Sequence, residues 1–173
     1  MTRLTRVQGL VAAARGDHAL AERRLTEAAD GWRRRSRGRL GGDTAVSKAP
    51  VEEVWKLLYD PARFPEWWVG VETVRQPTGD SPGGYTMYPN GYPDFPMPQT
   101  VDTSAEDRRI VISCLVSDLR FRWRLEPLPH DTTQISVHVD IPDKEAHRLD
   151  AQRDAISRSV RRLADLAGQN GRG

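Results

Sequence analysis

Two alternating apolar runs followed by one long helical pattern constrain the fold more than any other feature of this sequence. Phe121, Trp123 and Leu125 alternate with polar residues, which is the period of a strand with one buried face. Residues 133–141 alternate in the same way, and a proline-containing bend at 127–131 separates the two runs. The pattern therefore predicts two antiparallel strands that share one apolar face.

The register of this predicted pair follows from its apolar faces. Aligning them places Leu125 opposite Ile135 and Trp123 opposite Val137. The same alignment sets two polar pairs on the outer face of the sheet, namely Arg122 beside His138 and Arg120 beside Asp140. We interpret both as surface cross-strand pairs and not as catalytic dyads.

The C-terminal pattern predicts one amphipathic helix from about Lys144 to Leu166, with Gly168 as its stop. Arg153, Arg158 and Arg161 lie on its polar face. The apolar stripe recurs at helical spacing and consists of Leu149, Ile156, Val160, Leu163 and Ala167. Strands followed by a helix that buries one stripe indicate an α+β fold in which the helix packs on the sheet.

Further strands are expected upstream of this pair. Turn residues separate five strand-like runs, namely 44–48, 71–75, 85–88, 99–103 and 109–117. The first run is short because Gly41-Gly42 precedes it. Alternation leaves two inward faces open for the last run, either Ile110, Ile112, Cys114 and Val116 or Val111, Ser113 and Leu115. A helix starts at Ala49-Pro50 and ends at Asp60-Pro61.

The N-terminal segment differs from the rest in charge and pattern. Residues 1–42 carry ten arginines against four acidic residues, a net charge of +6, whereas the remainder has a net charge of −4. Residues 1–35 read as two short helices broken at Gly16-Asp17, and 36–43 as a basic, glycine-bearing linker. The hairpin either docks on the body or frays, or it offers an adaptor surface to a partner or a second copy. No aromatic residues interleave with the arginine run 33–39, so nucleic acid is not an expected partner.

This hairpin resembles a single tetratricopeptide repeat. The matching residues are Gly9, Ala12, Gly16-Asp17, Ala21, Leu25 and Ala28. One repeat cannot bury both of its faces, and we find no second copy in the sequence.

Composition excludes several classes of protein. Cys114 is the single cysteine, so an internal disulfide and a multi-cysteine metal site are excluded. The apolar runs are too short to span a bilayer, and no secretion signal follows Met1, so we expect a cytoplasmic protein. No phosphate loop, metal-ligand pair or nucleophile elbow occurs, so neither a cofactor nor a metal is expected. Arginine supplies all but three of the 26 basic residues, which is typical of bacterial genes rich in GC.

The opening of the second part resembles the START-related (SRPBCC) superfamily, which includes polyketide cyclases and Bet v 1-like proteins. The residues that carry the resemblance are 49–55 (APVEEVW), Asp60-Pro61 and 64–67 (FPEW). The resemblance covers about 44–167 and implies a helix-grip fold, in which a curved antiparallel sheet wraps around a long C-terminal helix. It further implies a cavity between sheet and helix that binds lipids or polyketides. We expect this domain at 44–168, after the hairpin, with a tail at 169–173.

An unusual proline-rich and aromatic segment at 88–98 either forms the mouth of this cavity together with Trp67 and Trp68 or simply caps the core. Apolar residues with inward parity, together with this segment, give the expected ligand-binding set. That set is Trp67, Trp68, Tyr85, Met87, Tyr88, Tyr92, Phe95, Cys114, Phe121, Trp123, Val137, Ile156 and Val160.

The leading hypothesis is therefore a domain that binds a small hydrophobic ligand, lipid or polyketide-like, inside the cavity. The first alternative is a polyketide aromatase/cyclase or dehydratase that uses acid–base residues in the same cavity. Its candidate groups would be Tyr85, Tyr88, Arg122, Arg124 and His138, and parity turns the last three outward, so no catalytic residue is assigned. The second alternative is a protein-interaction or chaperone co-factor module that acts through residues 1–35.

Overall fold

In the part of the chain that the structure describes, seven antiparallel strands form one sheet in the order β1-β7-β6-β5-β4-β3-β2. The computed structural model describes residues 39–76 and 84–171, so the predicted hairpin at 1–35 lies outside the described residues. The strands are β1 (Arg39–Ser47), β2 (Val71–Arg75), β3 (Gly84–Pro89), β4 (Met97–Ser104), β5 (Arg109–Cys114), β6 (Arg120–Leu128) and β7 (Thr132–Ile141).

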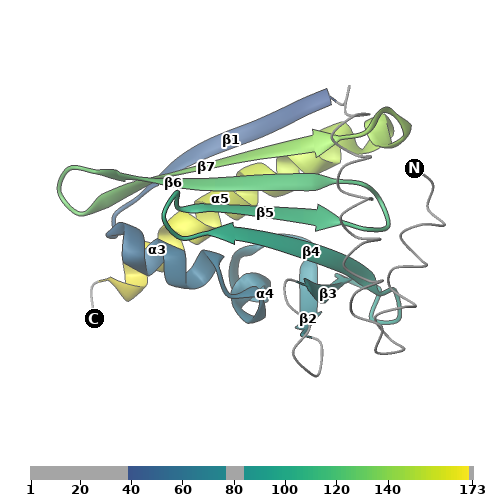
Figure 1. The fold of residues 1–173 in the computed structure, drawn as a ribbon, viewed down its shortest axis with the longest axis horizontal. Helices are drawn as coiled ribbons and strands as arrows, with labels where there is room; N and C mark the ends of the chain where they lie inside the picture. The colour runs from purple at the N-terminus through teal and green to yellow at the C-terminus, as the bar shows by residue number, and fades with distance from the viewer. Residues whose placement is uncertain (1–38, 77–83, 172–173) are drawn as a thin grey trace. The chain divides into compact units, whose positions relative to one another are not determined.

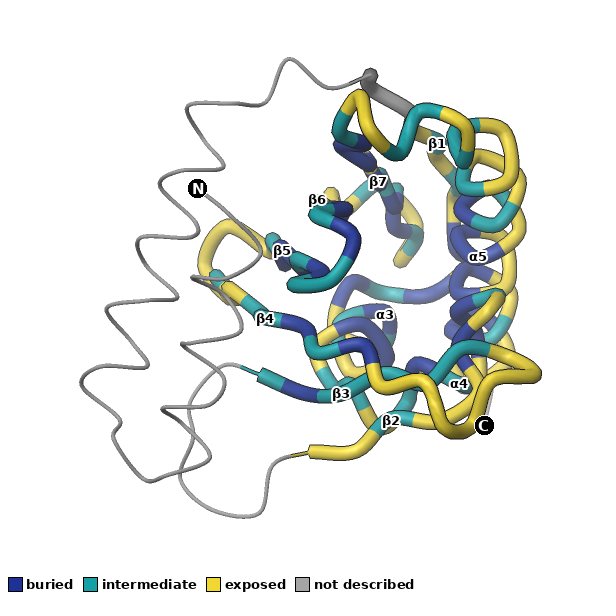
Figure 2. The backbone as a smooth tube through the Cα atoms, turned by 90° about the vertical axis from the view of Figure 1, so that its right-hand side faces the viewer, coloured by how far each residue is buried: buried dark blue, intermediate teal, exposed yellow. Residues whose placement is uncertain are grey.

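The helices lie at the ends of this sheet and across one face of it (Figure 1). They are α3 (Val51–Leu58), the 3-10 helix η1 (Pro61–Arg63), α4 (Phe64–Trp67), the 3-10 helix η2 (Asp143–Arg148) and α5 (Leu149–Asn170). The sheet curves around α5, and the buried residues of α5 lie on the side that faces the strands (Figure 2). The α+β helix-grip fold is thus confirmed. Within the described residues, no helix is long and apolar enough to cross a membrane.

The register predicted for the last two strands is confirmed. Leu125 pairs with Ile135 and Trp123 with Val137, and all four side chains are buried. Arg122 lies opposite His138, as expected, but its guanidinium bonds diagonally to the Asp140 carboxylate at 2.9 Å. On β5 the structure selects the first of the two open faces, because a core row consists of Ile110, Ile112 and Cys114.

The first strand is longer than the sequence indicated. β1 begins at Arg39 and pairs with β7 along its whole length, so residues 39–43 belong to the sheet and not to a linker. Gly42 has no room for a side chain because β7 approaches closely. A Cβ on Gly42 would lie 2.9 Å from the Val137 carbonyl oxygen and 3.0 Å from His138 Nδ1. Gly42, which we interpreted as part of a break, thus marks a close backbone approach.

Two element ends also differ from expectation. The run predicted at 109–117 ends at Cys114, because Cys114 pairs with Leu119 across a turn in which Asp118 has a positive φ of 62°. The last helix starts later and ends later than predicted: η2 precedes it, and it continues past Gly168 to Asn170. Gly168 is buried beside the residue that follows β1, and a Cβ on Gly168 would lie 3.8 Å from atoms of Lys48. Gly168 therefore lies inside the helix and does not end it.

An aromatic cluster fills one end of the core. Phe64 and Trp67 lie on α4, and Trp68 directly follows it. The three rings pack edge to face, tilted or stacked, with centroids 5.2–5.4 Å apart. Trp123 on β6 meets Trp67 at 5.1 Å and Trp68 at 5.6 Å. The Trp67 indole N–H donates to the Leu57 carbonyl at 3.1 Å, which ties α4 to α3. The α4 segment is thereby fixed over the sheet, and Trp68 is placed beside α5.

Candidate functional site

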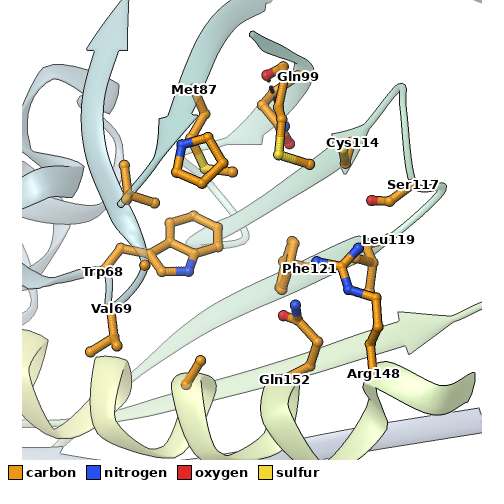
Figure 3. A pocket seen from close by; sticks show the side chains of 15 residues that line it. Trp68, Val69, Met87, Gln99, Cys114, Ser117, Leu119, Phe121, Arg148 and Gln152 are labelled. Carbon is orange, nitrogen blue, oxygen red and sulfur yellow. Dashed lines mark hydrogen bonds between the residues drawn. The ribbon is translucent and has the colours of Figure 1, made fainter. Parts of the chain in front are cut away.

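A cavity of about 210 Å³ lies between strands β2–β6 and the first half of α5 (Figure 3). One end is apolar and aromatic, with walls formed by Trp68, Val71, Met87, Met97 and Phe121. Ser117, Arg148 and Gln152 carry polar groups toward the other end, whereas Gln99 lies nearer to Met87 (Figure 3). The site therefore combines an apolar chamber with a polar end, which is the arrangement of a pocket for an amphiphilic small molecule.

The helical wall of the cavity comes from a single face of α5 and the turn before it. Arg148, Gln152 and Ala155 are spaced by four and three residues, so their side chains project from the same side of the helix. Figure 3 shows Arg148 and Gln152 reaching from the helix toward Leu119 and Phe121.

A hydrogen-bonded serine holds this helix against the segment after α4. Ser159 is fully buried, accepts a hydrogen bond from the Val69 amide at 2.9 Å and donates to the Ala155 carbonyl at 2.6 Å. Val69 and Ala155 both line the cavity. Ser159 therefore joins two walls of the site.

The sheet wall follows from strand alternation. Met97 and Gln99 on β4 share one face, and Gln99 pairs with Cys114 on β5. Gln99 is buried, and its amide N–H donates to the Met97 carbonyl at 3.0 Å, which fixes the side chain at the cavity wall. The Cys114 thiol is buried and free, and it lines the same wall.

Tyr85 lies on the neighbouring strand, in the core behind this wall. Its ring packs edge to face on Phe64 at 5.5 Å, and its hydroxyl has no hydrogen-bond partner among the described residues. Burial, and next the nearby Cys114, raise the pKa of Tyr85 well above its usual range. The phenol therefore stays protonated and is not poised to act as a base.

The structure places the thirteen expected ligand-binding residues in three kinds of surroundings. Four line the cavity: Trp68, Met87, Cys114 and Phe121. Six pack in the core and do not line it: Trp67, Tyr85, Trp123, Val137, Ile156 and Val160. Three lie on β3 or in the loop after it and do not line it either: Tyr88, Tyr92 and Phe95.

The aromatic rings of the proline-rich segment do not line the cavity. Tyr92 and Phe95 have exposed fractions of 66% and 52%, and the guanidinium of Arg75 lies 5.0 Å above the Tyr88 ring. Only the two ends of the segment, Pro89 and Met97, reach the cavity. Proline prevents the middle of the segment from continuing the ladder, so these residues turn outward to solvent.

Sequence reasoning missed most of the cavity's polar side chains. It did not single out Gln99, Ser117, Arg148 or Gln152, because polar residues were assigned to solvent. The four- and three-residue spacing from Arg148 to Ala155 was an available signal, since it marks a second helical stripe beside the apolar one.

The acid–base candidates on β6 and β7 lie away from the cavity. Arg122, Arg124 and His138 are exposed on the opposite face of the sheet, as parity predicted. Within the described residues no His, Cys, Asp and Glu cluster could hold a metal ion. The side chains at the cavity's polar end can donate hydrogen bonds to a bound oxygen, through one hydroxyl, one amide and one guanidinium.

Comparison with known proteins places this geometry in context. The family model described as polyketide cyclase/dehydrase and lipid transport matches residues 43–168. None of the curated proteins is a significant match to the chain.

Solved structures share the fold at low sequence identity. The Zhui aromatase/cyclase from Streptomyces is 18% identical with a TM-score of 0.61, over 76% of this chain and 94% of its own. The di-domain ARO/CYC BexL is 19% identical with a TM-score of 0.61, over 73% of this chain and 45% of its own. A START superfamily protein from Mycobacterium smegmatis is 16% identical with a TM-score of 0.56, over 78% and 98% of the two chains.

Proposed function

Because the chain belongs to the polyketide cyclase/dehydrase and lipid transport family, we propose that it binds one small hydrophobic molecule in the cavity between the sheet and α5. The observation that supports this most is the cavity itself, which is lined by Trp68, Met87, Met97 and Phe121 and measures about 210 Å³. A concave site lined mainly by apolar and aromatic side chains, with a few polar groups, is typical of a small-molecule pocket.

The volume limits the size of that molecule. A cavity of about 150 Å³ holds one benzene, and this cavity measures about 210 Å³. It is smaller than the roughly 300–1,000 Å³ of a pocket for a drug-sized ligand. The cavity therefore encloses one or two fused rings or a short acyl chain, and a larger polyketide would extend through its opening.

A neutral bicyclic probe tests this function without charge effects. We expect 2-naphthamide to bind the full-length chain with one site in isothermal titration calorimetry, with an affinity between micromolar and millimolar. Ala155→Phe places a ring inside the cavity and should abolish binding, because Ala155 lines it.

Ala151→Phe is the matched control, since Ala151 lies on the exposed side of the same helix. It adds the same ring to α5 outside the cavity and should leave the affinity unchanged. Circular dichroism verifies that both variants fold. Equal binding to the two variants, or no binding to the unmodified chain, would refute the proposed function.

Aromatase/cyclase chemistry is a second candidate, favoured by the donors at the polar end. Arg148, Ser117 and Gln152 could stabilise the oxygen of an enolate formed during ring closure. Incubation with a poly-β-ketone thioester tests it: turnover predicts a cyclic product whose rate falls in Arg148→Met. Absence of product while 2-naphthamide still binds would leave ligand binding as the function.

A further inference from the structure

Three donor side chains gather at one end of the cavity. Ser117 follows β5, Arg148 ends η2, and Gln152 lies one turn further on α5. In Figure 3 they lie at the opposite end of the cavity from Trp68 and Met87. A ligand that fills the chamber therefore has one end beside aromatic and thioether groups and the other end beside hydrogen-bond donors.

The Ser117 hydroxyl is an unsatisfied group inside this site. Its residue is 3% exposed, and the hydroxyl has no hydrogen-bond partner among the described residues. Buried polar groups are almost always hydrogen-bonded, so an unpaired hydroxyl at a cavity wall indicates that something else supplies the partner. A serine hydroxyl donates one hydrogen bond, and a ligand oxygen is a suitable acceptor.

Arg148 adds a positive charge, and its ion pair uses only one of its guanidinium nitrogens. Its side chain is 35% exposed and contacts the Glu145 carboxylate through one nitrogen, Nη1, at a long 3.4 Å. A guanidinium has five N–H donors in a planar fork, which matches the two oxygens of a carboxylate. The long contact with Glu145 is weak and leaves the fork able to bind a second carboxylate.

We infer that the ligand of this cavity is a small carboxylic acid whose apolar body lies between Trp68, Met97 and Phe121 and whose carboxylate binds Arg148, Ser117 and Gln152. This inference rests on the proposed function and names the ligand class for the same site. The cavity volume restricts the body to one or two aromatic rings or a short chain. Arginine, a hydroxyl and an amide all offer N–H or O–H donors, so the polar end favours an anionic acceptor over a neutral one.

A matched pair of ligands isolates the charge. 2-Naphthoate and 2-naphthamide have nearly the same shape and differ in whether the terminal group is anionic. At about pH 7, where a carboxylic acid is ionised, we expect the unmodified chain to bind the acid about tenfold more tightly than the amide. Arg148→Met removes the guanidinium and retains an unbranched stem, so it should abolish this preference and bring the affinities for acid and amide within about twofold of each other.

Two further variants support the assignment. Glu145→Gln removes the carboxylate that competes for Arg148, so naphthoate should bind about two- to fivefold more tightly, with the amide unaffected. Arg158→Met is the control, because Arg158 lies on α5 in an exposed ion pair with Asp154 and does not line the cavity. It removes one positive charge from the same helix and should preserve the preference for the acid.

The outcomes separate this inference from the proposed function. Equal affinity for acid and amide in the unmodified chain overturns the inference and leaves ligand binding intact. A preference that persists in Arg148→Met, or that is lost equally in Arg158→Met, overturns the role of Arg148. If neither molecule binds, the proposed function fails and the inference fails with it.

Discussion

Replacing Ser159 by alanine tests whether one buried hydroxyl holds the wall of the cavity. In the structure this hydroxyl accepts from the Val69 amide at 2.9 Å and donates to the Ala155 carbonyl at 2.6 Å. The substitution leaves the amide of Val69 without its acceptor in a half-buried position. The carbonyl of Ala155 loses less, because it lies in a helix that offers it the amide four residues on.

The magnitude follows from this asymmetry. Leaving a buried donor unsatisfied costs about 1–3 kcal/mol, whereas losing a hydrogen bond whose acceptor keeps another donor costs about 0.5–1 kcal/mol. Ser47→Ala is the matched control: the Ser47 hydroxyl is buried and donates to the Ala164 carbonyl at 2.7 Å, again within α5. Ser159→Ala should therefore lower the free energy of unfolding by about 1 kcal/mol more than Ser47→Ala does.

Urea denaturation at about pH 7 measures both variants, since the unfolding free energy extrapolates linearly with denaturant. The midpoint temperature of thermal unfolding should fall by roughly 2–4 °C for each kcal/mol of stability lost in a chain of this length. Because Val69 and Ala155 line the cavity, 2-naphthamide should also bind Ser159→Ala more weakly and Ser47→Ala as before. Equal destabilisation by the two substitutions, or unchanged probe binding in Ser159→Ala, would refute the reasoning.

Gly42→Ala should destabilise the fold by about 1–3 kcal/mol in urea denaturation, because its Cβ would lie 2.9 Å from a backbone oxygen of β7; an unchanged midpoint would contradict the register of β1. The pKa of Asp43 lies below its usual value, and the largest cause is the hydrogen bond from Ser157. This pair therefore stabilises the fold at pH values above the pKa that Asp43 has in the unfolded chain. The stabilisation is lost as pH falls through the folded-state pKa. Ser157→Ala should thus be less stable than the unmodified chain at about pH 7 and converge with it at about pH 2; a gap that persists in acid would argue against the bond. Met97→Ala should weaken 2-naphthamide binding about tenfold in calorimetry, because Met97 lines the cavity. Phe95→Ala removes an exposed ring and should change the affinity less than about twofold. A larger effect of Phe95→Ala would indicate that the ligand binds at the 88–98 loop.

The parts of the fold that could be predicted are those in which apolar residues repeat with the period of a strand or of a helix. Alternation of Phe121, Trp123 and Leu125 set the parity of β6, and the matching face of β7 then fixed the register. The helical stripe of α5 was equally clear, because 3.6-residue periodicity cannot be mistaken for a strand over 22 residues. Both signals are local and are reinforced by burial.

The ends of elements and the cavity could not be predicted in the same way, because they depend on tertiary packing. Gly42 and Gly168 both resemble breaks in the sequence, yet each lies inside an element. At Gly42 the neighbouring strand β7 approaches too closely for a Cβ, whereas a Cβ on Gly168 would make only ordinary contact with Lys48. The choice between core and cavity depends on where α5 and the curved sheet fail to meet, and parity is identical for Trp123, which packs in the core, and Phe121, which lines the cavity. Ser117 faces the cavity because it lies in the turn after β5, where strand parity no longer applies.

Methionine methyl NMR tests the central claim most directly, that the ligand lies between the sheet and α5. The described residues contain two methionines, Met87 and Met97, and both line the cavity. With methyl-labelled protein, assigned through Met87→Leu and Met97→Leu, addition of 2-naphthoate should shift both signals and give nuclear Overhauser effects from the naphthalene protons to each methyl. Saturating naphthoate that leaves both methyl signals unmoved would contradict binding in this cavity.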